Sequence, residues 1–442
     1  MVELATETVF TWGAPPVKFG AGAADELAHD LGQRGVERVL LVTDPGVAAS
    51  GAPERIRKTL LEAGMAAEVF DGVHVEPTDE SLRAAVEHAG RAGGWDGFLA
   101  VGGGSSIDTA KAVNLLTTNP GDLMDYVNRP VGEGRAPSAP LKPLVAVPTT
   151  AGTGAESTPV CVLDVLGLKV KTGISHPRLR PALAVVDPLL TLTLPPQATA
   201  ASGMDVVCHA LEAYTARRWT AYPRRAPDER VAYCGANPVS DAFCERALRI
   251  VGGSLRRAVL AGHDLEARTD MAMAATFAGM GFGNAGVHLP HACAYPIAGL
   301  VRDYHPDGYP GEQPLVPHGQ SVAVTAPDCF RFTFPADPER HLRAAGLLAE
   351  GSGEPRRGAP VGRLDGPPTA AEDPAEQLPA ELVRLMRDLG IPNGTGALGY
   401  GEDDVEDLVA GALKQERLLV IAPRDPTTQD LAGIFRSSLR NW

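Results

Sequence analysis

The stretch GMDVVCHALEAY at residues 203–214 sets an aspartate and a histidine four residues apart in an otherwise apolar segment. In a helix, Asp205 and His209 would lie on the same face, and their apolar neighbours predict that this helix is buried. A buried carboxylate needs a cationic partner, which is either a metal ion or a positively charged side chain. The motif alone leaves both alternatives open.

Two later segments add imidazoles. The sequence NAGVHLPHACAYPIAG (284–299) contains His288 and His291, and PLVPHGQSVAV (314–324) contains His318. One carboxylate with three imidazoles is a mixed oxygen and nitrogen set that suits Fe(II) or Zn(II) better than Mg or Ca. A single histidine is more often an ordinary core or surface residue, but several of them in apolar segments punctuated by Gly and Pro favour a metal site.

A glycine-rich segment in the first half, VGGGSSIDTAK, follows an apolar run and would open a helix. Its glycines let backbone N–H groups approach a phosphate, and the start of a helix adds a favourable dipole. The glycines are Gly102, Gly103 and Gly104. Ser105 and Asp108 have the S-x-x-D spacing of a helix N-cap. The alternative is a tight strand-to-helix turn without a ligand.

Two further segments favour a dinucleotide. Asp44 ends the apolar run RVLLVTD, where an acid can hydrogen-bond both ribose hydroxyls and repel a 2′-phosphate, so that NAD is favoured over NADP. The segment VPTTAGTGAES supplies the hydroxyls of Thr149, Thr150 and Thr153 among small residues. Neither spacing is the Rossmann G-x-G-x-x-G, which indicates a different kind of dinucleotide site.

The elements that must position these residues change in type near residue 195. Before it, short apolar runs alternate with helical patterns, which predicts a parallel, doubly wound sheet. The predicted strands are 38–43, 66–70, 97–101, 144–148 and 183–187, and the predicted helices between them include 53–64 and 79–92. After it, the patterns are helical, at 197–218, 238–262, 264–282, 338–350 and 376–390. We therefore predict an α/β domain at 1–195 and an all-helical domain at 196–442, with a solvated loop at 351–375.

Composition excludes several classes of partner. The chain has 442 residues and a net charge of −14, which argues against nucleic acid or an anionic membrane surface as a partner. No apolar run is long enough for a transmembrane helix. The six cysteines include no CxxC pair and fit reduced thiols. Because the first residues also lack a targeting pattern, we expect a cytoplasmic protein.

Five ordered segments together resemble the signatures of the iron-containing (group III) alcohol dehydrogenases. They are GGGSSIDTAK, PTTAGTGAES, GMDVVCHALEAYTA, LPHACAYPIAG and VPHG. The resemblance covers almost the whole chain and implies an N-terminal dinucleotide-binding domain, a helical C-terminal domain and a divalent metal in the cleft between them. Dimers are common among such proteins, so a homodimer is expected.

The resemblance also assigns roles to individual residues. It implies the metal ligands Asp205, His209, His291 and His318, with Fe²⁺ favoured and Zn²⁺ possible. It implies that NAD is held by Asp44, Gly102, Gly103, Gly104, Ser105, Asp108, Thr149, Thr150, Thr153 and Lys171.

One position departs from ordinary family members. Most of them carry a second histidine four residues after the third ligand, where this chain has Tyr295. A phenol still donates a hydrogen bond but is a poorer proton shuttle at neutral pH. We predict catalytic roles for Tyr295 and Lys171, with a packed aromatic ring as the alternative for Tyr295. His288 is expected to support a ligand or to be uninvolved.

Two insertions, at 215–236 and 300–316, also depart from ordinary members. The first contains Arg217, Arg218, Arg224, Arg225 and Arg230. Arginine binds carboxylates through paired hydrogen bonds, so this cluster is predicted to recognise acidic substrates. The alternative is a solvated loop, balanced by Asp228 and Glu229.

The insertions, Tyr295 and phrases such as GISHPRLRPALAVVDP resemble the hydroxyacid–oxoacid transhydrogenase branch of the family. That branch transfers a hydride from 4-hydroxybutyrate to 2-oxoglutarate, so small hydroxy-acid and oxo-acid substrates are expected. The alternatives are a conventional NAD-dependent alcohol dehydrogenase, a lyase of the sugar-phosphate cyclase type and a nucleotide sensor without catalysis. The Asp205-x-x-x-His209 pair disfavours the lyase, whose metal sets resemble Glu/His/His.

Overall fold

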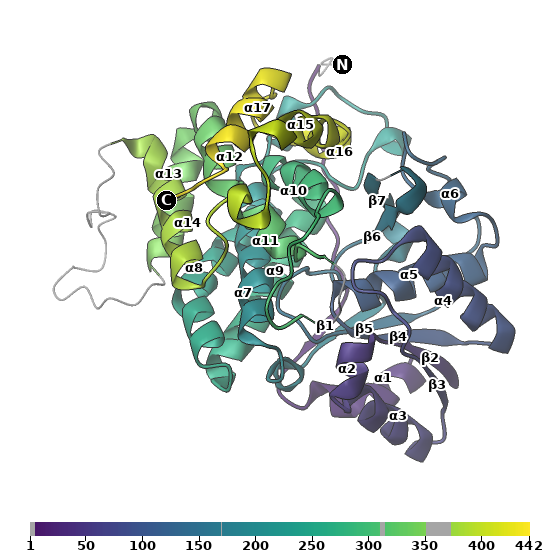
Figure 1. Cartoon of the computed structure of the whole chain (residues 1–442). Coiled ribbons are helices and arrows are strands. Elements are labelled where there is room, and N and C mark those ends of the chain that lie inside the picture. The colour runs from purple at the N-terminus through teal and green to yellow at the C-terminus, as the bar shows by residue number, and fades with distance from the viewer. Residues whose placement is uncertain (1–4, 169, 310–313, 351–372) are drawn as a thin grey trace. The chain divides into compact units, whose positions relative to one another are not determined.

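The computed structural model describes residues 5–168, 170–309, 314–350 and 373–442 (Figure 1). Its contacts divide the chain into two compact units. The α/β unit contains residues 11–194, and the helical unit contains residues 5–10 together with 195–442. Residues 5–10 belong to the helical unit because the N–H of Glu7 donates to the carbonyl of Tyr222 at 2.9 Å and its carboxylate accepts from the N–H of Arg225 at 3.2 Å.

The α/β unit is built on a six-stranded sheet in which all neighbouring strands are parallel. In spatial order the strands are β1 (Val17–Phe19), β8 (Leu183–Val186), β5 (Leu144–Pro148), β4 (Gly97–Gly102), β2 (Arg38–Val42) and β3 (Ala66–Phe70). This sheet and the helical second unit confirm the predicted fold class. Strand β1 was not predicted, because three half-buried residues give too short a pattern.

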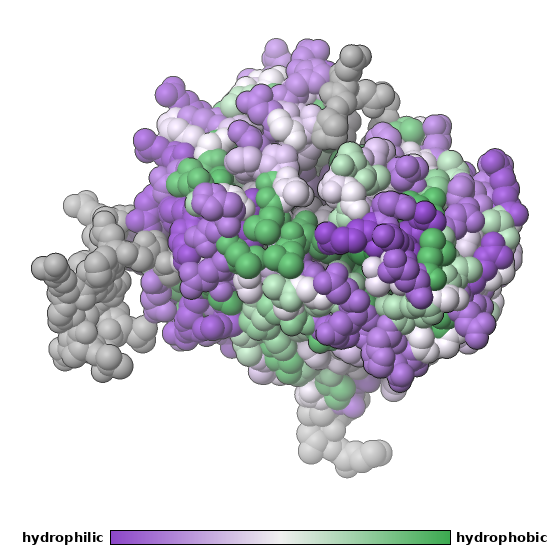
Figure 2. All heavy atoms as spheres, turned by 90° about the horizontal axis from the view of Figure 1, so that it is seen from below, coloured by the Kyte–Doolittle hydropathy of each residue, from purple (hydrophilic) through white to green (hydrophobic). Residues whose placement is uncertain are grey.

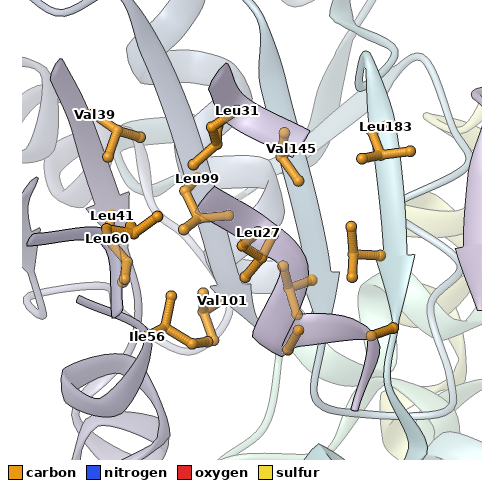
Figure 3. Packing of buried hydrophobic residues seen from close by; sticks show 14 of the residues in the cluster. Leu27, Leu31, Val39, Leu41, Ile56, Leu60, Leu99, Val101, Val145 and Leu183 are labelled. Atoms are coloured by element: carbon orange, nitrogen blue, oxygen red, sulfur yellow. The ribbon is translucent and has the colours of Figure 1, made fainter. Parts of the chain in front are cut away.

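Helices cover both faces of this sheet. On one face lie α1 (Leu27–Gly32) and α3 (Ala52–Glu62), whose leucines pack against strand residues such as Leu41 (Figure 3). On the other face, α4 (Asp79–Ala92) and α5 (Gly104–Thr118) pack against residues such as Leu40. Leu40 and Leu41 face opposite sides because side chains alternate along a strand. Both faces are therefore buried, as the continuous apolar runs predict.

Smaller elements complete the α/β unit. Strands β6 (Val160–Val165) and β7 (Val170–Ser175) form an antiparallel pair that the sequence analysis did not predict. The short helix α2 (Pro45–Ala49) follows β2, and the short helix α6 (Leu123–Tyr126) follows α5.

The described part of the second unit is helical apart from isolated bridges. Its α-helices are α7 (Pro196–Thr215), α8 (Pro238–Leu260), α9 (Leu265–Ala285), α10 (Leu289–Gly299), α11 (His318–Ala323), α12 (Ala326–Thr333), α13 (Pro338–Glu350), α14 (Gln377–Asp388), α15 (Val405–Leu413), α16 (Glu416–Leu419) and α17 (Thr428–Ser437). Helix α7 is buried over most of its length and contacts α8, α9 and α11. The side chains of Asn237 and Asp264 cap α8 and α9.

Hydrophilic residues predominate on the face shown in Figure 2, with smaller hydrophobic groups between them. Among the described residues, every helix is too short or too polar to cross a bilayer. Most of the loop predicted at 351–375 lies outside the described residues.

Candidate active site

Three helices of the helical unit bring the four predicted ligands together. Asp205 and His209 lie on α7, His291 lies in the first turn of α10, and His318 begins α11. One ligand atom from each of Asp205, His209 and His291 lies within 4.8 Å of the others. The Nε2 atom of His318 is 3.9 Å from Oδ1 of Asp205. Residues separated by 113 positions in the sequence therefore converge on one carboxylate oxygen.

A glycine permits this convergence. Gly319 follows His318 in the first turn of α11, and a Cβ atom there would lie 1.9 Å from the carbonyl oxygen of Ala201 on α7. The same atom would lie 3.1 Å from Cβ of Asp205. Any side chain at position 319 would push α11 away from α7 and carry His318 away from Asp205. The glycine of the VPHG motif is thus required by close helix packing.

The donor set fits a divalent cation. Oδ1 of Asp205 is buried and makes no hydrogen bond to described residues, and it lies 3.6 Å from Nε2 of both His209 and His291, beyond hydrogen-bond length. The Nε2 atoms of His209 and His291 are 3.1 Å apart. Ring nitrogens that face each other around an unpaired carboxylate oxygen are arranged as ligands for a common cation.

Electrostatics around the cluster favour a positive charge at its centre. Burial would raise the pKa of Asp205, but His209, His318 and His291 hold that pKa below its usual value. Burial lowers the pKa of His209 to about 3, which keeps this ring neutral and able to coordinate. Burial opposes charge on His291, yet Glu212 and Asp205 raise its pKa to about 10. The two carboxylates therefore stabilise positive charge at this point.

Glu212 is a site residue that the sequence analysis missed. Its side chain is fully buried, and Oε1 lies 2.6 Å from Nδ1 of His291. Oε2 accepts the backbone N–H of His288 at 2.6 Å. A proton on Nδ1, held by this carboxylate, directs the Nε2 lone pair of His291 towards Asp205 and His209. The available signal was spacing, since Glu212 follows His209 by three residues on the same face of α7.

His288 supports the same region without joining the cluster. Its Nδ1 accepts the N–H of Leu289 at 2.8 Å and so caps α10, while Nε2 lies 3.0 Å from the hydroxyl of Thr215. Burial lowers its pKa to about 4. His288 is therefore a neutral residue that fixes the start of the helix carrying His291.

Tyr295 lies one helical turn after His291 on α10. Its ring centroid is 6.2 Å from that of His318, and its side chain is buried. Its hydroxyl accepts a hydrogen bond of 3.0 Å from Nη2 of Arg417, which lies on α16. The phenol oxygen is thus held by a cation, which leaves its own proton available to a third group.

The arginines of the 215–236 insertion do not converge on one point. Arg217 forms an ion pair with Asp425, and Arg218 pairs with Asp337 at 3.0 Å. Nε of Arg230 lies 3.6 Å from a carboxylate oxygen of Glu7. The sequence pattern showed the charge of these side chains but not the distant carboxylates that neutralise it.

The other two arginines of the insertion lie near the residues preceding the α/β unit. Arg225 places its guanidinium over the ring of Tyr222, 5.4 Å from the centroid. Arg224 is exposed, and its backbone N–H donates to the carbonyl of Ala5. These positions fit the alternative of a charged surface segment better than a joint substrate site.

In the α/β unit, the glycine segment forms the predicted turn between β4 and α5. Gly103 is the N-cap of α5. A Cβ atom at Gly104 would lie 2.7 Å from Cγ2 of Thr153, and one at Gly103 would lie 3.3 Å from Cγ2 of Thr150. The two threonines of the 147–157 segment therefore pack directly on the glycines, and the helix N-terminus is surrounded by N–H and hydroxyl groups suited to a phosphate.

The predicted S-x-x-D cap is not formed. Gly103 occupies the cap position, and the hydroxyl of Ser105 instead accepts the N–H of Glu76 at 3.1 Å. The carboxylate of Asp108 is buried, lies 3.2 Å from Nζ of Lys111 and accepts the N–H of Val162 at 2.9 Å. Asp108 therefore joins α5 to β6, which indicates a structural role.

The remaining predicted cofactor residues make defined contacts. Asp44 caps α2 by accepting the N–H of Val47 at 3.0 Å, and its second oxygen accepts the hydroxyl of Ser106 at 3.1 Å. Lys171 is buried on β7 and pairs with Glu76 at 2.5 Å and Asp164 at 2.9 Å. Its charge is thus balanced by two carboxylates. The N–H of Thr149 donates to the carbonyl of Gly102 at 3.0 Å, which ties the two loops together.

Two models of one protein family match most of the chain. The model described as iron-containing alcohol dehydrogenase matches residues 14–188, and the model for the C-terminal part of that family matches residues 229–439. The chain belongs to the iron-containing alcohol dehydrogenase family. It is therefore an oxidoreductase, and its family and the converging ligands support a divalent metal together with NAD.

Curated relatives place it on one branch. The hydroxyacid-oxoacid transhydrogenase of Bos taurus is 44% identical over 98% of this chain and 91% of the relative. The Homo sapiens protein of that name is 42% identical over the same shares. Among solved structures, a 1,3-propanediol oxidoreductase has a TM-score of 0.81 at 34% identity over 98% of this chain and 100% of its own. An Oenococcus oeni alcohol dehydrogenase has a TM-score of 0.80 at 28% identity over 97% and 99%.

These relatives contradict the cytoplasmic location expected from composition. The Bos taurus, Rattus norvegicus and Mus musculus transhydrogenases are all named as mitochondrial proteins. The expectation rested on reduced cysteines and on a start without a targeting pattern. Reduced thiols occur in every reducing compartment, so the cysteine content does not distinguish one such compartment from another.

Proposed function

We propose that the protein is a metal- and NAD-dependent hydroxyacid–oxoacid transhydrogenase. In this reaction 4-hydroxybutyrate and 2-oxoglutarate become succinate semialdehyde and 2-hydroxyglutarate. One hydride and one proton leave the donor and enter the acceptor, so no external oxidant is consumed. The observation that carries the proposal is the buried cluster of Asp205, His209 and His291 with His318 beside it, in a chain 44% identical to proteins of this name.

The proposed metal ligands are Asp205, His209, His291 and His318. A divalent ion held there would act as a Lewis acid on the oxygen of the reacting carbon. One carboxylate and three neutral imidazoles suit Fe(II) and Zn(II), and the family description favours iron. With a metal ion at Nε2 in place of the proton there, Glu212 would hold the remaining proton of His291 on Nδ1.

The proposed cofactor residues lie around the start of α5. Backbone N–H groups of Gly103 and Gly104 would hold the pyrophosphate, and the hydroxyls of Thr150 and Thr153 line the same turn. Asp44 would meet the ribose hydroxyls by exchanging its present hydrogen bonds. Bound NAD supplies the hydride carrier for both half-reactions.

Tyr295 is the proposed hydrogen-bond donor to the substrate oxygen. Its oxygen accepts from Arg417, so its proton is the group left to donate. Removal of this proton donor by Tyr295→Phe is expected to lower kcat more than it raises KM, because the bond strengthens as negative charge develops on the substrate oxygen.

The decisive experiment is acceptor dependence. With 4-hydroxybutyrate and NAD, near-ultraviolet absorbance reports NADH in solution, and product analysis reports 2-hydroxyglutarate. The proposal expects sustained turnover only when 2-oxoglutarate is present. A steady rise of free NADH without the oxo acid would instead identify a conventional alcohol dehydrogenase, the activity that names the family.

A further inference from the structure

We propose that Arg417 is the residue that binds the carboxylate of the acidic substrates. The proposal rests on the function proposed above and assigns the recognition of acids to α16 instead of the arginine-rich insertion. It would make Arg417, with the phenols around it, the specificity determinant that separates this chain from dehydrogenases of uncharged alcohols.

The first observation is the setting of the guanidinium. Nη2 of Arg417 donates to the hydroxyl of Tyr295 at 3.0 Å, and Cζ lies 5.8 Å from the centroid of the same ring. The phenol of Tyr233 also lies near this guanidinium and stabilises its charge. Helix α16 contacts α10, which carries both Tyr295 and His291. Arg417 is half-buried and is held in place by two aromatic side chains.

The second observation is that this charge is not neutralised. Among the described residues, Arg417 forms an ion pair with no carboxylate, whereas Arg217, Arg218 and Arg230 each lie beside one. The phenol of Tyr295 accepts from one donor of the guanidinium, and neither nearby phenol carries a negative charge at neutral pH. A guanidinium has five N–H donors in a planar fork that matches a carboxylate. Arg417 therefore has both the charge and the free donors to bind an anion.

The third observation is the position of this cation relative to the ligand cluster. Tyr295 bridges the two, since its ring lies beside His318 while its hydroxyl contacts Arg417. One turn of α10, about 5.4 Å of helix rise, separates Tyr295 from His291. An acid whose carboxylate binds Arg417 thus has its other end directed to the cluster, past the phenol that would donate to its oxygen.

The chemistry of the two proposed substrates fits a single anchor. In 4-hydroxybutyrate the carbinol carbon is joined to the carboxylate through two methylene groups. In 2-oxoglutarate the keto carbon is joined to the distal carboxylate through two methylene groups as well. One fixed guanidinium can therefore place the reacting carbon of donor and acceptor at the same point, which is what hydride exchange through one site requires.

The Tyr233 contact also gives the 215–236 insertion a role. Tyr233 lies within it and contacts Arg417, while a Cβ atom at Gly286 would lie 3.2 Å from Cβ of Tyr233. The insertion thus contributes a phenol that orients the anchor, and not the anchor itself. An arginine from elsewhere in the chain supplies the charge that the sequence analysis assigned to the insertion.

The test compares Arg417→Met and Arg417→Lys with wild type and with Arg424→Met. Arg424 is a matched control because it is exposed and lies over an aromatic ring, 4.1 Å from the centroid of Phe332, in the same unit. Steady-state kinetics would be measured with 4-hydroxybutyrate and with 1-butanol, which lacks the carboxylate. Calorimetry would measure the binding of 2-oxoglutarate directly, without turnover.

The expected result is a selective loss for acids. In Arg417→Met the ratio of kcat/KM for 4-hydroxybutyrate to that for 1-butanol should fall about a hundredfold or more, and 2-oxoglutarate binding should weaken by a similar factor. Arg417→Lys should show values between those of wild type and Arg417→Met, because lysine keeps the positive charge but lacks the paired N–H donors of the guanidinium. In wild type, acids with one or three methylenes should be poorer substrates than those with two.

Three results would overturn the proposal. Unchanged acid preference and 2-oxoglutarate affinity in both variants, with thermal unfolding like that of wild type, would show that Arg417 binds no substrate. An equal loss in Arg424→Met would show that the effect is general. If Arg417→Met fails to fold, an unchanged preference in Arg417→Lys is sufficient to refute it. Wild-type enzyme that shows no acceptor-dependent turnover would instead refute the proposed function.

Discussion

Replacement of Glu212 by glutamine should weaken metal binding while leaving the ligands themselves unchanged. Glu212 accepts the Nδ1 proton of His291 at 2.6 Å in a fully buried position. A glutamine can still accept the N–H of His288 through its carbonyl, but its NH₂ group would then face Nδ1 as a donor. His291 would shift its proton to Nε2, the nitrogen that lies 3.1 Å from Nε2 of His209. The ligating lone pair would be lost.

The magnitude follows from this tautomer shift. Removal of a carboxylate that orients a ligating histidine typically lowers metal affinity about 10- to 100-fold, or about 1.4 to 2.7 kcal/mol. The assay is competition with a coloured chelator for Fe(II) or Zn(II). Glu245→Gln is the matched control, since Glu245 pairs with Arg343 on the surface of α8. A metal affinity of Glu212→Gln equal to that of wild type would refute the orienting role of Glu212.

Three further predictions concern the α/β unit. Burial raises the pKa of Glu156 to about 7, so the folded state keeps a proton that the unfolded state releases above about 4.5, and stability falls as pH rises between these values. Above pH 7, Glu156→Gln should therefore have a free energy of unfolding about 3 kcal/mol higher than wild type, seen as a higher unfolding temperature, and below pH 4.5 it should match wild type. Lys111→Met should cost about 3–5 kcal/mol in denaturant unfolding, because it leaves Asp108 buried without its cation; an unchanged midpoint would contradict this. Gly104→Ala should weaken NAD binding measured by fluorescence, and Thr153→Ala should restore part of it, because the new Cβ would lie 2.7 Å from Cγ2 of Thr153.

Local patterns in the sequence predicted most of the fold. A buried parallel strand is a continuous apolar run, so the strand at 144–148 has the predicted limits. The half-buried edge strand at 66–70 also has the predicted limits. The helix at 79–92 also begins and ends as predicted, and the helix starting at 338 begins as predicted, since amphipathic spacing is a local property. The short strand β1 and the pair β6 and β7 were missed because their stability comes from partners distant in sequence.

The site was predicted only as far as residue type determines it. Asp205 and His209 are recognisable because carboxylate and imidazole are rare in a buried helix. Glu212 on the same helix was overlooked, because its role depends on His291 of another helix. The five arginines of the insertion were predicted to bind substrate because they are clustered in the sequence. The sequence does not show which of them is neutralised by a carboxylate of the protein itself. Arg417 belongs to no arginine cluster in the sequence, and its contact with Tyr295 is visible only in the structure.

Transfer of deuterium between the two acids tests the central claim most directly. Metal-loaded enzyme with bound NAD would be given 4-hydroxybutyrate carrying deuterium on the carbinol carbon, together with unlabelled 2-oxoglutarate and free unlabelled NADH. Hydride exchange at one site predicts that 2-hydroxyglutarate carries deuterium at C2 and that free NADH does not dilute it. Product without deuterium, with the label appearing in free NADH, would contradict a transhydrogenase and show that each half-reaction releases its cofactor.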